Sequence, residues 1–263
     1  MVRKIAMSTV RGISVRESID MAVNSGCEGI DIKVDYLPEE EEKKKEILDY
    51  AKEKGLELSL HAPCSDINIA ARNQGIRKES INQVKKIIDM AQKYGARVVT
   101  FHPGRLTSIR ENSEEKWKIL LDSVAEIAAY AAEKRVHAAL ENMECRKKEL
   151  VRTVSDLNRF AVLAAENPYF GAALEISHFA ANRIFLPELD ELKLPVKNVY
   201  ISQYMDGRPH FSLTEANGEI QLDKVQRLLD SVGYDSYMIL GLKSIQGCKV
   251  FEESRKILED SFR

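Results

Sequence analysis

One stretch decides the expected fold: Ala138-Ala139-Leu140-Glu141-Asn142-Met143, an apolar run that ends abruptly in a carboxylate. A glutamate at the end of a buried strand is costly unless a cation or hydrogen bonds meet it. The same pattern, an apolar strand closed by His or Glu, recurs at three other positions: His61, His102 and Glu175. Four such strand ends predict one shared site, and we expect a metal ion in it.

Short apolar runs alternate with helical patterns along the whole chain. Eight strand-then-helix units, each punctuated by Gly or Pro, predict an α/β protein with a parallel sheet. The 263 residues fit a single (β/α)8 TIM barrel, which takes about 250 residues, so we expect one domain over residues 1–263. A doubly wound open sheet is the alternative, but no strand-to-helix turn carries a Gly-x-Gly-x-x-Gly or Walker loop.

The expected elements follow this alternation. The strands are expected at 5–8, 29–34, 56–60, 97–101, 138–141, 171–174, 196–202 and 237–240. The helices are expected at 15–24, 39–54, 79–93, 113–134, 153–165, 180–194, 222–231 and 250–262. The helix at 180–194 is weak and interrupted by proline, and the segment around His210 reads as an irregular loop.

Composition narrows the class of protein. Lys and Arg number 39 against 41 Asp and Glu, a net charge of -2, which lacks the basic footprint of an electrostatic nucleic-acid binder and makes DNA a less favoured partner. The four cysteines form no Cys-x-x-Cys pair and fit reduced thiols, and we expect Cys64 and Cys145 to be buried. No stretch resembles a signal peptide or a membrane span, so we expect a cytoplasmic protein without a membrane partner.

In a closed parallel barrel, the carboxyl ends of all strands open on one face, where the chemistry of that fold lies. The residues expected to converge there are His61, His102, Glu141 and Glu175, with His178 just behind and His210 in the loop after the seventh strand. Imidazole and carboxylate groups together suit zinc, manganese or iron. As an alternative, Glu175 and His178 are spaced as a helix cap and its partner.

Further side chains are candidates for binding a substrate. Asn142 follows Glu141 and is expected either to orient its neighbour or to face the substrate. Arg105 and Arg208 are able to hold a phosphate or sugar oxygen through two hydrogen bonds, although solvated surface arginines are more common.

The motifs carry a family resemblance. In order, the chain contains His61-Ala62-Pro63, Phe101-His102-Pro103-Gly104, Leu140-Glu141-Asn142-Met143 and Leu174-Glu175-Ile176-Ser177-His178. This combination resembles the xylose isomerase-like TIM barrels, which include sugar isomerases and epimerases and the endonuclease IV type of abasic-site repair enzyme. The resemblance spans nearly the whole chain and is specific for the superfamily, not for one activity.

The resemblance implies one or two divalent metal ions, with zinc or manganese favoured. It implies ligands at six positions: His61, His102, Glu141, Glu175, His178 and His210. Glu141 would bridge two ions in endonuclease-like members and would be both ligand and catalytic carboxylate in the sugar enzymes. Glu175, also a catalytic candidate, stands where the family usually has Asp.

Four positions depart from the family pattern. Tyr200 replaces a metal-binding His, and Gln203 replaces an Asp. Arg208 stands where an endonuclease would have Asp, and Gly241 replaces the Glu that ends the eighth strand. A tyrosine, Tyr200 or Tyr204, is therefore a candidate for assisting catalysis in a lyase or dehydratase with a single catalytic carboxylate.

Three functions compete on these grounds. The favoured one is a metal-dependent sugar isomerase/epimerase-like enzyme that acts on a small hydroxylated or phosphorylated metabolite. The first alternative is an endonuclease IV-like phosphodiesterase acting on abasic DNA, and the second is a barrel that binds a ligand without catalysis. A small-molecule substrate is the expected partner, and the sequence is compatible with a homodimer.

Overall fold

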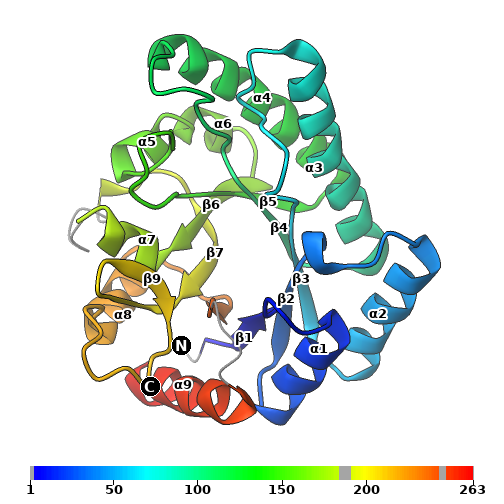
Figure 1. Cartoon of the computed structure of the whole chain (residues 1–263), viewed down its shortest axis with the longest axis vertical. Helices are drawn as coiled ribbons and strands as arrows, with labels where there is room; N and C mark the ends of the chain where they lie inside the picture. The colour runs from blue at the N-terminus through cyan, green and yellow to red at the C-terminus, as the bar shows by residue number, and fades with distance from the viewer. Residues whose placement is uncertain (1–2, 184–190, 243–246, 263) are drawn as a thin grey trace.

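A closed barrel of parallel strands, surrounded by helices, forms the centre of the molecule (Figure 1). The computed structural model describes residues 3–183, 191–242 and 247–262. The barrel strands are β1 (Ile5–Ser8), β2 (Gly29–Lys33), β3 (Glu57–His61), β4 (Val98–Phe101), β5 (His137–Glu141), β6 (Phe170–Glu175), β7 (Val196–Ile201) and β10 (Met238–Leu240). β1 pairs with β10, which closes the ring, and the expected TIM barrel is confirmed.

The helices follow the strands around the outside of the ring (Figure 1). They are α1 (Val15–Asn24), α2 (Glu41–Glu53), α3 (Gln74–Tyr94), α4 (Ser113–Lys134), α5 (Val154–Asn158), α6 (Ala161–Ala165), α7 (Ile176–Ala181), α8 (Leu222–Ser231) and α9 (Gly247–Ser261), with a 3-10 turn, η1 (Val34–Tyr36), after β2. Ser14 and Glu17 form a reciprocal capping box at the start of α1.

Some helices differ from the ranges expected from the sequence. α3 begins five residues earlier than expected, since the Asn73 side chain accepts from the backbone N–H groups of Gly75 and Ile76 and caps the helix there. The expected helix at 153–165 is divided into α5 and α6 at Phe160, which is fully buried. The helix after β6, α7, begins and ends earlier than the weak helix expected at 180–194, of which residues 184–190 lie outside the described residues.

The segment around His210 is not an irregular loop. It is an antiparallel hairpin of β8 (Gln203–Met205) and β9 (Arg208–Phe211), turned at Asp206 and Gly207, both with positive φ. Asp-Gly is a strong signal for a two-residue hairpin turn, so the sequence contained the information that this expectation missed. The hairpin brings His210 back over the barrel.

Inward-facing side chains fill the barrel in layers. One buried layer consists of Ala6, Val98, Ala139, Ala173, Tyr200, Tyr237 and Ile239. Asp31 is fully buried within the barrel and accepts hydrogen bonds from the hydroxyl groups of Ser8 (3.2 Å), Ser59 (2.8 Å) and Tyr200 (3.2 Å). The next inward positions, at the carboxyl ends of the strands, carry the polar groups of the candidate site.

No helix within the described ranges is both long and apolar enough to cross a membrane. The single-domain organisation, the cytoplasmic location and the compatibility with a homodimer stay predictions.

Candidate metal centre

Three of the expected ligands meet at the carboxyl ends of β3, β4 and β5. Glu141 is 5% exposed, and its Oε2 atom lies 3.0 Å from His61 Nε2 and 3.4 Å from His102 Nε2. The ligand atoms of the three residues all lie within 4.8 Å of one another. The barrel register produces this convergence, since β4 pairs with both β3 and β5.

The contact between His61 and Glu141 requires a positive charge. His61 Nδ1 lies 2.8 Å from the Ala62 carbonyl and donates to it, so Nε2 faces the carboxylate. A neutral ring with its proton on Nδ1 would place a lone pair against a carboxylate oxygen. A proton or a metal cation at Nε2 removes this repulsion.

The pKa shifts of Glu141 and His61 agree with an ion pair between the two residues. Burial opposes a charge on Glu141, yet His102 and His61 outweigh it and hold the pKa of the carboxyl well below its usual value. Burial lowers the pKa of His61, but Glu141 reverses the effect and raises it overall. Burial lowers the pKa of His102, although Glu141 opposes the shift.

The donor set fits a divalent ion. Two ligands bound 2.0–2.1 Å from a tetrahedral zinc ion lie about 3.3 to 3.4 Å apart, and the two separations from Glu141 are 3.0 and 3.4 Å. Two imidazoles and a carboxylate leave a fourth position open, as in catalytic zinc sites. His102, with 28% of its side chain exposed, marks the side on which solvent reaches the group.

A second group of donors lies at the ends of β6 and β9. His178 Nε2 and His210 Nε2 are 3.2 Å apart, and their Nδ1 atoms contact the carbonyls of Asn142 (2.9 Å) and Gly241 (3.1 Å). Two neutral rings that donate through Nδ1 would set two lone pairs against each other, so this pair also needs a proton or a cation. The two histidines are joined to the first group through Glu141 Oε1, which lies 3.7 Å from His178 Nδ1.

Glu175 lies between these groups and is 2% exposed. Its Oε1 atom accepts from the backbone N–H (3.1 Å) and hydroxyl (2.7 Å) of Ser177, which makes it the cap of α7. The helix-cap alternative is therefore correct for Glu175. Its Oε2 atom is 3.6 Å from His210 Nδ1, and burial raises the pKa of this carboxyl although His178 opposes the shift.

Asn142 positions Glu175. Its side-chain amide donates to the Glu175 carbonyl (3.1 Å) and accepts from the Glu175 N–H (2.8 Å), and the residue is fully buried. Both ends of the amide are thus used to fix the end of β6 to the end of β5. These hydrogen bonds orient Glu175, whereas the sequence predicted that Asn142 would orient its neighbour Glu141, and the substrate-binding role of Asn142 stays a prediction.

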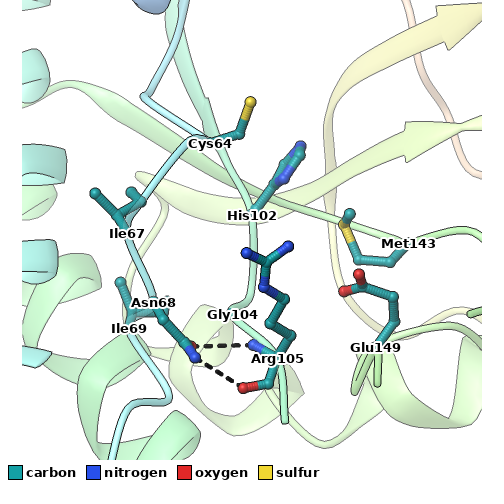
Figure 2. Close-up of a pocket in the computed structure, with 9 residues that line it drawn as sticks. All are labelled: Cys64, Ile67, Asn68, Ile69, His102, Gly104, Arg105, Met143 and Glu149. Atoms are coloured by element: carbon teal, nitrogen blue, oxygen red, sulfur yellow. Dashed lines mark hydrogen bonds between the residues drawn. The ribbon is translucent and has the colours of Figure 1, made fainter. Parts of the chain in front are cut away.

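The two arginines lie at the rim. Arg208 is exposed and begins β9, beside the hairpin turn. Arg105 follows β4 and lines a groove together with His102, Cys64, Asn68, Met143 and Glu149 (Figure 2). Cys64 and Cys145 are exposed, so the expectation that both are buried is wrong. Cys64 is held at the surface by Asp35, which accepts from its N–H.

Gly104, in the loop after β4, is required by close packing. Its φ is +79°, and a Cβ atom there would lie 2.6 Å from Asn68 Oδ1 and 2.8 Å from the Ala70 nitrogen.

We expect Gly104→Ala to lower the free energy of unfolding by about 2 to 4 kcal/mol, because backbone strain and overpacking both destabilise the variant. Gly55→Ala is the matched control, with φ +78° and no atom within 4 Å of its Cβ, and about 1 kcal/mol is expected. Urea unfolding measures both; equal losses would show that the Asn68 contact is not tight.

Comparison with known proteins identifies the family. A family model described as a xylose isomerase-like TIM barrel matches residues 19–261. The chain belongs to the xylose isomerase-like TIM barrel family. The uncharacterized protein MJ1311 of Methanocaldococcus jannaschii is 26% identical over 212 residues, which are 78% of this chain and 70% of that protein.

Solved structures share the fold of this xylose isomerase-like barrel. A D-tagatose 3-epimerase-like protein has a TM-score of 0.80 at 21% identity, covering 98% of this chain and 96% of its own. L-ribulose 3-epimerase has a TM-score of 0.81 at 13% identity, covering 99% of this chain and 94% of its own.

The departure at Gly241 is coupled to Glu175. A Cβ atom at position 241 would lie 3.3 Å from Glu175 Oε2, and the Gly241 carbonyl accepts from His210. Glu175 is one methylene longer than the Asp that the resemblance leads us to expect. Its carboxylate therefore occupies space beside the end of β10, where the family's usual Glu would begin.

The departure at Tyr200 changes the barrel interior. The Tyr200 hydroxyl lies 2.9 Å from Thr100 Oγ1 and 3.2 Å from Asp31 Oδ1, and its ring is 6.3 Å from the His61 ring. Burial raises the pKa of this phenol well above its usual value, so it stays protonated. The hydrogen bonds of Tyr200 to Thr100 and Asp31 run into the barrel, and its role as a catalytic group stays a prediction. Ser177 is a site residue that the sequence reasoning missed.

Proposed function

We propose that this protein is a metal-dependent enzyme of the isomerase/epimerase type, acting on a small polyhydroxylated metabolite. One observation carries the proposal, namely the buried Glu141 carboxylate with the Nε2 atoms of His61 and His102 directed at it. These residues would hold a zinc or manganese ion. When bound, the ion would polarise a carbonyl and the hydroxyl on the adjacent carbon. This polarisation eases removal of the proton from the hydroxyl-bearing carbon.

Glu175 is the group best suited to take and return that proton. Burial raises its pKa, which brings a carboxyl closer to the range in which it both accepts and donates a proton near neutral pH. Ser177 holds Oε1 through two hydrogen bonds, which fixes the carboxylate and directs Oε2 to the side of His210 and Gly241. Asn142 fixes the backbone of the same residue.

The second candidate is a phosphodiesterase acting on abasic DNA. The facing Nε2 atoms of His178 and His210 favour it, because their 3.2 Å separation suits a second ion and two-metal sites clamp phosphoryl oxygens. The net charge of -2 weighs against a DNA duplex as the partner. We rank it below the isomerase/epimerase class for that reason.

Parallel assays of the protein loaded with zinc or manganese test the ranking. A panel of aldoses and ketoses is incubated in D2O and followed by NMR, and an abasic-site duplex is followed by gel electrophoresis. We expect deuterium to enter at a carbon next to the carbonyl of at least one sugar and the duplex to stay intact. Duplex cleavage that disappears with His102→Ala would reverse the ranking, and inactivity on both would favour a barrel that binds without catalysis.

Removal of metal is expected to lower the melting temperature by about 5 to 10 °C. An ion at about 100 times its dissociation constant stabilises the native state by about 2.7 kcal/mol, and proteins of this size shift by a few degrees per kcal/mol. Differential scanning calorimetry before and after dialysis against a chelator measures the shift, and added zinc or manganese should restore it. His137→Gln, at the opposite end of β5, is the control and should respond like the wild type. A melting temperature that changes neither on chelation nor on addition of zinc or manganese would argue against a bound metal.

A further inference from the structure

The backbone of Arg105 is held from both sides at the rim of the barrel. The Asn68 amide donates to the Arg105 carbonyl (2.9 Å) and accepts from its N–H (3.0 Å). On its other edge Arg105 forms an antiparallel bridge with Glu149. Asn68 belongs to the loop after β3 and Glu149 to the loop after β5, so both neighbouring loops fix the position from which the arginine side chain starts.

The Arg105 side chain extends into the groove beside the candidate metal centre. Figure 2 shows its guanidinium directed toward His102, with Met143 and Glu149 together on one side and Cys64 beyond His102. No ion pair within 4.0 Å joins Arg105 to a carboxylate in the described part of the chain. Burial raises the pKa of the neighbouring Glu149, although Arg105 opposes the shift.

The groove and the metal cluster share one residue. His102 lines the groove and also points its Nε2 atom at Glu141. A ligand whose hydroxyl-bearing end lies at Glu141 is therefore able to contact the Arg105 guanidinium with its other end. A second cation lies on the same part of the rim, since Lys33 pairs in register with His61 and its charge lowers the pKa of Cys64, against the larger effect of burial.

We propose that this groove binds an anionic group of the substrate, a phosphate monoester or a carboxylate, through the Arg105 guanidinium. A planar guanidinium fork forms two parallel charge-assisted hydrogen bonds with such a group, which are stronger than its bonds to neutral hydroxyls. The inference rests on the proposed function, because it takes the His61, His102 and Glu141 cluster to hold the other end of the substrate. It narrows the substrate class from polyhydroxylated metabolites to sugar phosphates or sugar acids.

Calorimetric titration with three matched probes tests the inference: D-ribulose 5-phosphate, D-ribonate and D-ribulose. We expect the wild type to bind one of the anionic probes at least about 10-fold more tightly than D-ribulose, and Arg105→Gln to abolish that preference while leaving D-ribulose binding unchanged. The anionic probe that loses affinity identifies phosphate or carboxylate as the group recognised. Arg105→Lys should restore only part of the preference, because lysine keeps the charge without the fork.

The control is Arg110→Gln, an exposed arginine five residues further along that does not line the groove. Equal affinity of the wild type for all three probes, or an unchanged preference in Arg105→Gln, would overturn the inference. Metal content is measured in the same samples. A wild type without metal that still binds the anionic probe through Arg105 would refute the proposed function and leave the anion site standing.

Discussion

Replacement of Glu141 by glutamine is expected to empty the metal centre. The amount of bound zinc or manganese should fall from about one ion per chain to less than about a tenth after gel filtration, because a carboxamide oxygen is a weak ligand and affinity should fall more than about 100-fold. Mass spectrometry of the metal content measures the change. Glu144→Gln is the control, since Glu144 lies three residues further along and pairs with Arg146 outside the cluster.

The same variant makes a pH prediction for the metal-free protein. The pKa of Glu141 is lowered from 4.5, so its pairing stabilises the fold above that value and the contribution is lost as the pH falls through the lower folded pKa. The pKa of His61 is raised from 6.5, so its contribution is present below that value and is lost as the pH rises through the higher folded pKa. The stability advantage of wild type over Glu141→Gln should therefore be largest between pH 4.5 and 6.5.

A wild type that holds less than one ion per chain, with no further loss in Glu141→Gln, would contradict the metal centre. The variant is also expected to fold less stably, because His61 and His102 lose their buried acid partner. His102→Ala provides a second test, since His102 is partly exposed and its removal leaves the His61–Glu141 pair in place. It should lower the metal content without the same loss of stability.

The part of the site that depends on topology could be predicted from the sequence. Strand runs closed by His61, His102 and Glu141 are visible in one dimension, and a parallel barrel brings all such ends to one rim. The structure places these three side chains together, as expected. Their role as ligands stays a proposal, because position alone does not show a bound ion.

The parts that depend on side-chain direction could not be predicted. Strand β2 is buried on both faces, so nothing in its pattern shows that Asp31 and Lys33 face inward. The approach of Glu175 to Gly241 joins the ends of β6 and β10, which β7 separates in the barrel, and it appears only when the 3.3 Å distance is measured. The loop contacts of Asn68 are equally invisible, since one amide bonds to a residue 37 positions away.

Replacement of Glu175 by glutamine is expected to abolish proton transfer while leaving the metal bound. Glutamine keeps the shape, and its side-chain oxygen still accepts from Ser177, but it has no titrating group. Loss of a positioned acid/base typically costs about 10² to 10⁴ in rate. The measurement is the rate of deuterium incorporation into the sugar on which the wild type is active, with metal content determined in parallel.

Ser177→Ala is the matched variant, because it removes the hydroxyl bond to Oε1 and keeps the carboxylate. We expect it to lose far less activity than Glu175→Gln and to shift the acidic limb of the pH–rate profile to higher pH, because the Ser177 hydroxyl lowers the pKa of Glu175. If Glu175→Gln loses metal and activity together, Glu175 acts as a ligand and the proton passes through another group. If it keeps its activity, acid/base catalysis would have to be assigned to another group, and His210, whose Nδ1 atom lies 3.6 Å from Oε2, is the first to test. The first outcome would extend the metal-holding part of the centre from β3–β5 to β6, and the second would move the proton-handling group from β6 to β9.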